Sequence, residues 1–551
     1  MNVSYLIERI NSPIQIDLKA IETVNVQSYD SLKKLGFKPR GDLEHYLLSG
    51  EKFWNENPFN DRNWTFQLQA WRNIDPILLE YDRTRNTDLL IEASVVMKSW
   101  FNFSRENKHK FLWYDMAVGL RAQKIAYIAY HMKCNNVSQY DWFTVLAKEH
   151  ILRLLDDSEF SLNNHGIFQV HGLMALSNAF YNGGEIENSL RDKASSRIIK
   201  LWRNQFYPEG IHTENSPEYH IFAYNKFKTI LQCGWYDDLG ITDEMENVRK
   251  NFFWLCRPNG ELYPFGDSGT SKPHLIKDLV DDELRFTPEH QGIYYKMFSQ
   301  SGYFSAKNST AGIFFSTAKR STVHSHSDQL SFEWFDFDEP IIVDAGKYGY
   351  ISGPERRYVL SADAHNCLLI NQKPVTTELF KSNIIKFEKL NSGIFISAFL
   401  QGDTSSQTRS IYFSPGNFLL VIDDFITEKT SEVKQKFQFN YTSEINEDSA
   451  SLTLENKTII SYDVDFYSKD TKEYLSTKII SGIENDRLAS FVSDKYKSLK
   501  TAPSIINVIE ASSGVIATIF SKKENPYKVK LEDSKTISIS SPFTSEKIRF
   551  C

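Results

Sequence analysis

The apolar residues in the first half of the chain recur with helical spacing. In residues 87–104, 115–133, 141–157 and 167–181 they return at i, i+3, i+4 and i+7, and short polar breaks separate the segments. Amphipathic helices of this length bury one face against a neighbour. The pattern therefore predicts stacked helix pairs from about residue 28 to residue 285.

After about residue 300 the spacing changes to short alternating runs, rich in β-branched and aromatic residues and separated by turn residues. Helices followed by strands predict separate domains. We expect an α+β multidomain chain with a boundary near residues 280–300: a helical domain over 1–290 and an antiparallel β-sandwich over 291–551. The last hundred or so residues could form a smaller β subdomain. The strand runs are 302–318, 416–427, 432–443, 450–464 and 514–522.

The length of 551 residues and the composition bound the class of protein. A chain this long exceeds one hydrophobic core and suits two or three domains. The formal net charge of -7 argues against a nucleic-acid partner, although a local basic groove could still bind an acidic polymer. Aromatic residues make up 14% of the chain, enough for large cores and for faces that stack on sugar rings. No run is long and apolar enough for a membrane helix.

The cysteines and the first residues bear on location. Five scattered cysteines without a CxxC pair indicate reduced thiols rather than a disulfide framework. The first twenty residues lack the basic start and apolar core of a signal peptide, which predicts a cytoplasmic protein. A periplasmic or secreted protein is the alternative if an export signal has been trimmed. A homodimer is one option for its assembly.

Two polar clusters flank predicted helices. "LNNHGIFQVHGL" places Asn164 and His165 just before a helix, where the pair could be a helix cap and a core histidine or part of a site. "YPEGIHTENSPEYHIF" places Glu214, Tyr219 and His220 in a loop that enters a helix. An exposed polar loop is the plainer interpretation of this second cluster.

A third cluster combines histidines with acidic residues. In "VHSHSDQLSFEWF", alternation puts His324, His326 and Asp328 on one face at the start of a strand. Asp344 ends the next strand, and His365 precedes another. Two histidines and one aspartate form a plausible zinc set with a fourth position open. A hydrogen-bonded network of buried histidines and aspartates is the alternative.

Taken together, these segments resemble a known family. "NNHGIFQVHGL", "EGIHTENSPEYH", "HSHSDQLSFEWFDFDEPIIVDAGKYGY" and "RRYVLSADAHNCLLIN" occur in this order and are similar to the signature segments of heparinase II/III-like polysaccharide lyases. The resemblance runs from about residue 50 to 400 and fades over the last 150 residues. It implies a bacterial lyase of carbohydrate metabolism with an incomplete (α/α) toroid followed by an antiparallel β-sheet domain.

The family cleaves uronate-containing polysaccharides by β-elimination, which explains the residue types. Removing the C5 proton adds charge beside a carboxylate, so donors must neutralise that group while an acid protonates the leaving O4. The resemblance implies that Asn164 and His165 are the donors. It implies that Tyr219 is the acid and in some geometries the base, that His324 is the second base, and that Tyr348 is an active-site tyrosine. A tyrosine base would need a lowered pKa.

The resemblance also implies a structural zinc ion held by His326, Asp344 and His365, which supports the active site without touching substrate. The expected substrate is an anionic polysaccharide or oligosaccharide. An arginine can bind a carboxylate or sulfate with two parallel hydrogen bonds, so Arg121 is a candidate substrate ligand. Trp113 and Glu214 are further candidates.

Other functions compete with a lyase. A zinc-dependent glycan hydrolase would use a metal-bound water and need an open zinc position facing substrate. A non-catalytic glycan-binding or assembly protein of a surface-polysaccharide pathway would need no proton-transfer groups. A glycosidase needs two opposed carboxylates, for which Glu214 and Asp267 are available, but the Tyr and His motifs fit elimination better. The sequence leaves open which uronate polymer is bound, endo or exo action, and the identity of the metal.

Overall fold

The computed structural model describes residues 14–50, 53–138, 141–180, 183–273, 289–317, 319–470 and 474–550. The chain divides into two compact units. One, here called the helical unit, comprises residues 1–205 and 223–243; the other, here called the β unit, comprises residues 206–222 and 244–551. Each unit is described by itself.

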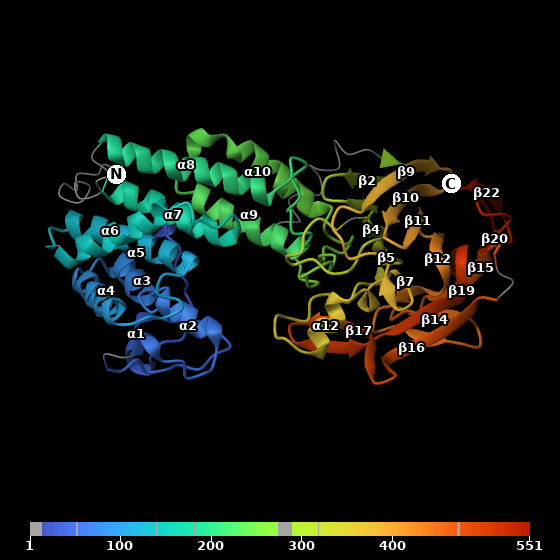
Figure 1. Cartoon of the computed structure of the whole chain (residues 1–551), viewed down its shortest axis with the longest axis horizontal. Helices are drawn as coiled ribbons and strands as arrows, with labels where there is room; N and C mark the ends of the chain where they lie inside the picture. Colours follow the sequence, from blue (N-terminus) through green and yellow to red (C-terminus); the bar gives the residue numbers. More distant parts are fainter. Residues whose placement is uncertain are drawn as a thin grey trace. The chain divides into compact units, whose positions relative to one another are not determined.

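The helical unit forms an incomplete (α/α) toroid, as predicted (Figure 1). The four helices expected from apolar spacing are all present, with ends within a few residues of the predicted ones. The helices are α1 (Tyr29–Leu35), α2 (Arg62–Gln69), α3 (Asp75–Thr84), α4 (Asp88–Glu106), α5 (Asp115–Cys134), α6 (Asp141–Leu155), α7 (Asn164–Ala179), α8 (Glu185–Gln205) and, shared with the β unit, α9 (Pro217–Leu231) and α10 (Ile241–Lys250).

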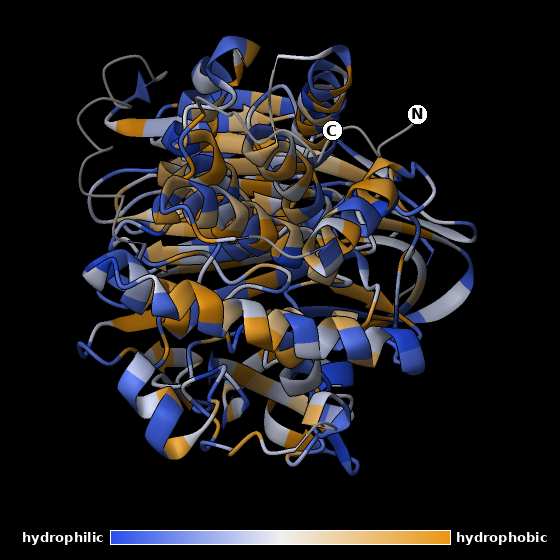
Figure 2. Cartoon of the chain, turned by 90° about the vertical axis from the view of Figure 1, so that its left-hand side faces the viewer, coloured by the Kyte–Doolittle hydropathy of each residue, from blue (hydrophilic) through white to orange (hydrophobic). Residues whose placement is uncertain are grey.

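The helical unit contains amphipathic helices and one pair of helices that is almost entirely buried. Figure 2 shows single helices that carry both hydrophobic and hydrophilic segments, whereas α5 and α7 are buried along most of their length. Two glycines let this pair approach closely. A Cβ added to Gly119 would lie 2.3 Å from the Phe168 carbonyl oxygen, and one added to Gly172 would lie 2.6 Å from the Gly119 oxygen. The toroid is therefore built around a backbone contact that larger residues would prevent.

The β unit contains antiparallel sheets, again as predicted. Strands β1 to β6 form a six-stranded sheet in sequence order, and a second sheet has the long strands β12 and β19 at its centre (Figure 1). The strands of the first sheet are β1 (Glu289–His290), β2 (Ile293–Phe298), β3 (Tyr303–Lys307), β4 (Gly312–Ser316), β5 (Ser331–Asp336) and β6 (Glu339–Ile342).

The second sheet has thirteen strands, and a separate three-stranded sheet follows at the end of the chain. The strands of the thirteen-stranded sheet are β7 (Leu368–Ile370), β8 (Lys373–Pro374), β9 (Ser382–Leu390), β10 (Gly393–Gln401), β11 (Ser405–Ser414), β12 (Phe418–Gln438), β13 (Glu444–Asn446), β14 (Ser451–Thr453), β15 (Ile459–Tyr467), β16 (Ser476–Glu484), β17 (Arg487–Lys495), β18 (Ser498–Thr501) and β19 (Pro503–Lys522). The last sheet consists of β20 (Lys528–Leu531), β21 (Thr536–Ser540) and β22 (Ser545–Arg549). The helix α12 (Pro354–Leu360) lies between β6 and β7 in sequence.

The sandwich core forms where the two large sheets face each other. Buried Phe332 and Trp334 of the first sheet belong to one hydrophobic cluster with Ile411, Phe437 and Phe520 of the second. Burial of such aromatic side chains supplies about 1.5–3 kcal/mol each. This core holds the loops at the strand ends, which carry the polar clusters, on a rigid support.

Two sequence-based expectations differ in detail from the structure. The two runs expected at 416–427 and 432–443 contribute to one strand, β12, which ends at Gln438. A bulge between Ile426 and Ser431 interrupts the alternation without ending the pairing with β19. The expected boundary at residues 280–300 falls partly on residues 274–288, which lie outside the described ranges. Among the residues that the structure describes, no helix is long and apolar enough to cross a membrane.

We predict that Gly119→Ala destabilises the helical unit by about 1–3 kcal/mol, because the new methyl group would force α5 and α7 apart. Urea unfolding followed by circular dichroism measures this. Gly41→Ala is the matched control, since no atom lies within 4 Å of its added Cβ. Equal stability of the two variants would contradict the close packing described here.

Candidate functional site

A single buried carboxylate organises the polar cluster of the β unit. Asp267 lies in a loop after the helices, and its two oxygens accept hydrogen bonds from two histidines and an arginine. His324 Nδ1 lies 2.9 Å from Oδ2, and His326 Nε2 lies 3.0 Å from Oδ1. The Arg356 guanidinium binds both oxygens, at 2.5 and 2.9 Å. Burial raises the pKa of Asp267, but these hydrogen bonds outweigh it and hold the pKa well below the usual range.

The backbone around Asp267 is tied to the same partners. The Asp267 N–H donates to the His324 carbonyl oxygen at 2.7 Å, so the two residues are joined at backbone and side chain. Gly266 packs against the same His324 carbonyl. A Cβ added to Gly266 would lie 2.6 Å from the His324 oxygen, and the φ of +58° also favours glycine. Ser268 Oγ lies 2.8 Å from Ser216 Oγ at the start of α9. The loop therefore fixes His324 relative to the first turn of α9.

The first turn of α9 presents Tyr219 to His324. The two rings stack with centroids 3.5 Å apart and an interplanar angle of 17°. The Tyr219 hydroxyl lies 3.0 Å from the Tyr350 hydroxyl, and the Arg356 guanidinium lies over the Tyr350 ring. Glu214 Oε2 is 3.9 Å from His324 Nε2. The β unit thus brings together the predicted residues Tyr219, His324 and Glu214.

The protonation of these groups follows from their surroundings. Burial raises the pKa of Tyr219; the hydrogen bond from Tyr350 lowers it by less, and the carboxylates of Asp267 and Glu214 add to the increase. Tyr219 is therefore a neutral proton donor at neutral pH, and the lowered pKa that a tyrosine base would need is absent. Burial also raises the pKa of Glu214. Because Asp267 is ionised, His324 donates through Nδ1, and its Nε2 is left as the basic nitrogen.

The prediction that His324, His326 and Asp328 share a face of a strand is wrong. All three lie in an irregular segment before β5, which begins at Ser331. His324 has a left-handed backbone with φ of 57°, a conformation that costs a non-glycine residue about 1–2 kcal/mol. The bonds to Asp267 hold it there. Asp328 is buried, and burial raises its pKa to about 6.

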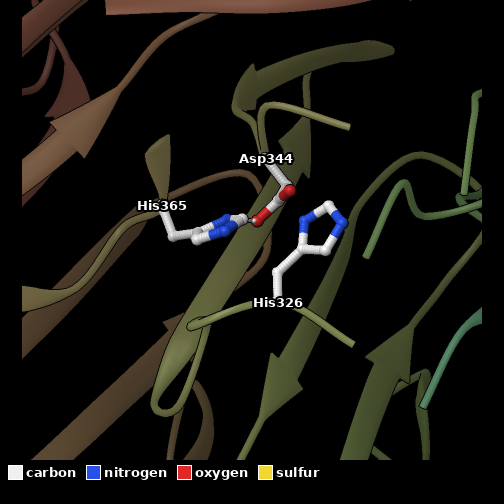
Figure 3. Close-up of side chains that lie close together, drawn as sticks. All are labelled: His326, Asp344 and His365. Carbon is white, nitrogen blue, oxygen red and sulfur yellow. Dashed lines mark hydrogen bonds and ion pairs between the residues drawn. The ribbon is translucent and has the colours of Figure 1, made fainter. Parts of the chain in front are cut away.

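The expected metal ligands do converge. His326, Asp344 and His365 are buried and offer ligand atoms within 4.8 Å of one another, and Figure 3 shows the three side chains pointing toward one another. His365 Nδ1 lies 2.7 Å from Asp344 Oδ2. His326 Nδ1 and His365 Nε2 are buried without a hydrogen-bond partner. Two such nitrogens beside a carboxylate fit a zinc ion, because an unpaired buried polar group is costly.

The cluster of candidate metal ligands rests on a second buried network. Asn366, next to His365, donates to the Phe332 and Val343 carbonyl oxygens and accepts from the Gln438 N–H. The Arg409 guanidinium donates to the Asn366 carbonyl oxygen and pairs with buried Asp423. These bonds join segments of both sheets behind the cluster, so its geometry is fixed by the sandwich.

Asn164 and His165 lie at the start of α7 in the helical unit. Asn163, not Asn164, caps the helix, because its side chain accepts the His165 N–H at 2.8 Å. His165 Nδ1 lies 3.1 Å from Asp115 Oδ2, which Ser161 also binds. The Asn164 amide is half-exposed and has no hydrogen-bond partner among the described residues. Both side chains are therefore accessible to a ligand.

The structure corrects the expectation that Arg121 binds substrate. Arg121 is fully buried and donates to the carbonyl oxygens of Gln69 and Leu112 and to His150 Nε2. Its guanidinium also lies between Trp100 and Trp113. Helical spacing alone gave no sign that this charge faces the core. Trp113 remains half-exposed, with the Arg153 guanidinium 4.1 Å from its ring.

The tyrosine that meets Tyr219 is Tyr350 rather than the expected Tyr348. Tyr348 packs against the apolar cluster of Ala345, Tyr358 and Val359. Sequence reasoning also missed Arg356 and the central role of Asp267. The signal for Tyr350 and Arg356 was their place inside quoted motifs: "DAGKYGY" ends in Tyr350, and "RRYVL" begins with Arg356. Asp267 was considered only as a glycosidase carboxylate.

Solved structures share this architecture over nearly the whole chain. A heparinase III gene product with methylated lysines superposes with a TM-score of 0.73 at 14% identity, covering 98% of this chain and 92% of that one. The heparan sulfate lyase HepC from Pedobacter heparinus gives 0.70 at 15% identity, covering 97% and 92%. A chondroitinase AC lyase gives 0.51 at 10% identity, covering 97% and 87%. At these identities the likeness establishes the fold. No curated protein matches the chain.

Family models settle the class of protein, which is that of the polysaccharide lyases. The model of the heparinase II/III N-terminus matches residues 3–295, and that of the heparinase II/III-like C-terminal domain matches residues 291–510. The chain belongs to the heparinase II/III-like family.

We predict that Arg121→Ala lowers the free energy of unfolding by about 3–5 kcal/mol, because it leaves a cavity and unpaired carbonyl oxygens. Urea denaturation measures this. Arg203→Ala, at an exposed position of α8, is the control and should change the stability little. If Arg121 were a surface ligand, the two variants would be equally stable.

Proposed function

We propose that this protein cleaves a uronate-containing polysaccharide by β-elimination, with Tyr219 and His324 as the proton-transfer pair. The stacked rings of Tyr219 and His324 carry the proposal, because they hold a protonated phenol and an imidazole side by side. In the reaction the C5 proton leaves to the base, the C4–O4 bond breaks, O4 takes a proton, and a C4–C5 double bond forms.

Tyr219 is the proposed acid. Its raised pKa keeps the hydroxyl protonated until the leaving O4 accepts the proton. The Tyr350 hydroxyl, 3.0 Å away, orients it. In this proposal Tyr350 takes the active-site position that the resemblance implied for Tyr348.

His324 is the proposed base. The ionised carboxylate of Asp267 holds the proton on Nδ1, orients the ring, and stabilises the imidazolium that forms when Nε2 takes the C5 proton. A carboxylate behind a histidine base serves the same purpose in serine hydrolases. Glu214, near Nε2, is placed to contact the substrate or the new imidazolium.

The carboxylate of the uronate must be neutralised before the C5 proton of the sugar ring becomes acidic enough to leave. We assign this to Asn164 and His165 on the family resemblance and on their chemistry. The amide of Asn164 is a donor without a described partner, and His165 Nδ1 lies 3.1 Å from the Asp115 carboxylate. The half-exposed ring of Trp113 is a further candidate for contact with a sugar ring.

We further propose that His326, Asp344 and His365 hold a structural zinc ion. When bound, the ion would neutralise the carboxylate and pair the two orphaned nitrogens. His326 would then donate its other N–H to Asp267, an arrangement typical of metal-bound histidines. The burial of all three residues argues against a zinc hydrolase, which needs an open metal position.

The proposed substrate is an anionic glycosaminoglycan-like chain. The named relatives are a heparinase III and a heparan sulfate lyase, which makes heparan sulfate the first polymer to test. Chondroitin sulfate and unsulfated polyuronates such as alginate complete the panel.

We predict that the wild type produces unsaturated uronates from at least one of these polymers, seen as new ultraviolet absorbance of the C4–C5 double bond. Tyr219→Phe should lower the rate by about 10²–10⁴, because the acid is lost while the ring stack is kept. Tyr350→Phe should reduce the rate more than Tyr348→Phe does, since only Tyr350 reaches the Tyr219 hydroxyl.

Tyr474→Phe, at a highly exposed tyrosine, is the matched control and should keep wild-type activity. Full activity of Tyr219→Phe would refute the assignment of the acid. New reducing ends without the double bond would indicate a hydrolase. Binding without cleavage of any polymer would indicate a glycan-binding protein.

We predict that the purified protein contains zinc and that His365→Ala removes it, because this change deletes one of the converging ligands. Plasma mass spectrometry measures the metal, and thermal unfolding should shift to lower temperature when a chelator is added. His324→Ala should keep the metal yet lose lyase activity, whereas His45→Ala should change neither. Equal metal content in wild type and His365→Ala would disprove the site.

A further inference from the structure

The hairpin of β17 and β18 lies beside the loop that carries Tyr350. Its turn and the residues on either side, 493–500, are here called the hairpin tip. The Ser493 N–H donates to the Ala345 carbonyl oxygen at 2.8 Å, and the Lys497 N–H donates to that of Tyr348 at 2.6 Å. The Tyr348 N–H in turn donates to Ser493 Oγ at 3.1 Å. These three bonds fasten the hairpin tip to the segment just before Tyr350.

Because Gly349 has no side chain, the hairpin tip can approach the backbone just before Tyr350 closely. Its φ of +153° lies in a region that L-residues rarely adopt, and an added Cβ would lie 2.9 Å from Cε2 of Tyr496. The Tyr496 ring therefore covers the backbone of the residue that precedes Tyr350. The ring nevertheless remains 56% exposed, and that of Tyr350 is 49% exposed. An accessible tyrosine, Tyr496, thus contacts the residue next to a second accessible tyrosine, Tyr350, whose hydroxyl is hydrogen-bonded to Tyr219.

Apolar side chains of the hairpin also pack against a buried cluster of the β unit. Leu488, Phe491 and Leu499 pack against the buried cluster that includes Tyr358 and Val359 of α12. Figure 1 shows β17 alongside α12. An exposed ring on an anchored hairpin loses little freedom on binding, which favours a ligand platform.

The charge of the hairpin tip is opposite to that of the whole chain. Lys495, Lys497 and Lys500 are exposed, against a single acidic residue, Asp494, in a chain of net charge -7. The Lys497 ammonium lies 5.1 Å from the centroid of the Tyr496 ring. None of these lysines forms an ion pair with a described carboxylate within 4 Å. An exposed aromatic ring with lysines on both sides of it in sequence suits a sugar ring that carries a carboxylate or sulfate.

We propose that the hairpin tip is a subsite for a further sugar residue of an anionic polysaccharide, beyond the residue that is cleaved at Tyr219. The ring of Tyr496 stacks on the sugar, and Lys495 and Lys497 bind its carboxylate or sulfate. This inference rests on the proposed lyase function. Such a subsite would make the enzyme favour chains long enough to reach both Tyr219 and Tyr496.

The test compares long and short substrates. Size-defined heparan sulfate and alginate fragments, tetrasaccharides and dodecasaccharides, are supplied to the wild type, to Tyr496→Ala and to a Lys495→Gln, Lys497→Gln double variant. For the dodecasaccharide we expect KM to rise about three- to tenfold with kcat unchanged. For the tetrasaccharide we expect no change. In the wild type, added salt should raise KM more than in the lysine variant.

Tyr474→Ala and Lys530→Gln are matched controls at exposed positions elsewhere in the β unit. An equal effect of the hairpin variants on both lengths, or none on either, would overturn the subsite. If the wild type cleaves nothing, the lyase proposal fails, and calorimetry with the same fragments decides the subsite separately. Weaker binding by the hairpin variants than by the controls would support it, and equal binding or none would overturn it.

Discussion

The β unit's candidate site depends on the carboxylate of Asp267. A buried negative charge is costly unless it is fully paired, and here one group satisfies His324, His326 and Arg356 at once. The same charge fixes the tautomer of the proposed base and the outer nitrogen of a proposed metal ligand. The proposed catalytic residues and the proposed metal ligands therefore share one electrostatic centre, and the strained backbone of His324 is held by it.

The sequence was a good guide to the fold because its periodic patterns are local. Helices α4 to α7 follow directly from apolar spacing, since each buries one stripe or, in α5 and α7, nearly all of its surface. Strand β12 was divided in two because polar residues fill its bulge, where pairing persists without alternation. The compact units were not predictable, since residues 206–222 join the β unit through contacts made far along the chain.

The site was predictable only where residue type and motif order carried information. The convergence of His326, Asp344 and His365 was expected from the family resemblance, and so was the importance of Tyr219 and His324. Asp267 and Arg356 were missed because their roles arise from contacts across 57 and 89 residues, which no local pattern reveals. Arg121 was misread because an arginine with suitable spacing can face solvent or core, and only packing decides.

The arrangement around Asp267 has a consequence for protein engineering. Asp267 and its partners come from three separate stretches of the chain, and a fourth stretch, the start of α9, supplies Tyr219 and the serine bond to the Asp267 loop. A designer who transplants only the histidine motif into a related scaffold would leave its counter-charge behind. The smallest portable module is consequently the set of four segments together with the sandwich that supports them. Homologous recombination at loop boundaries would tend to produce inactive chimaeras.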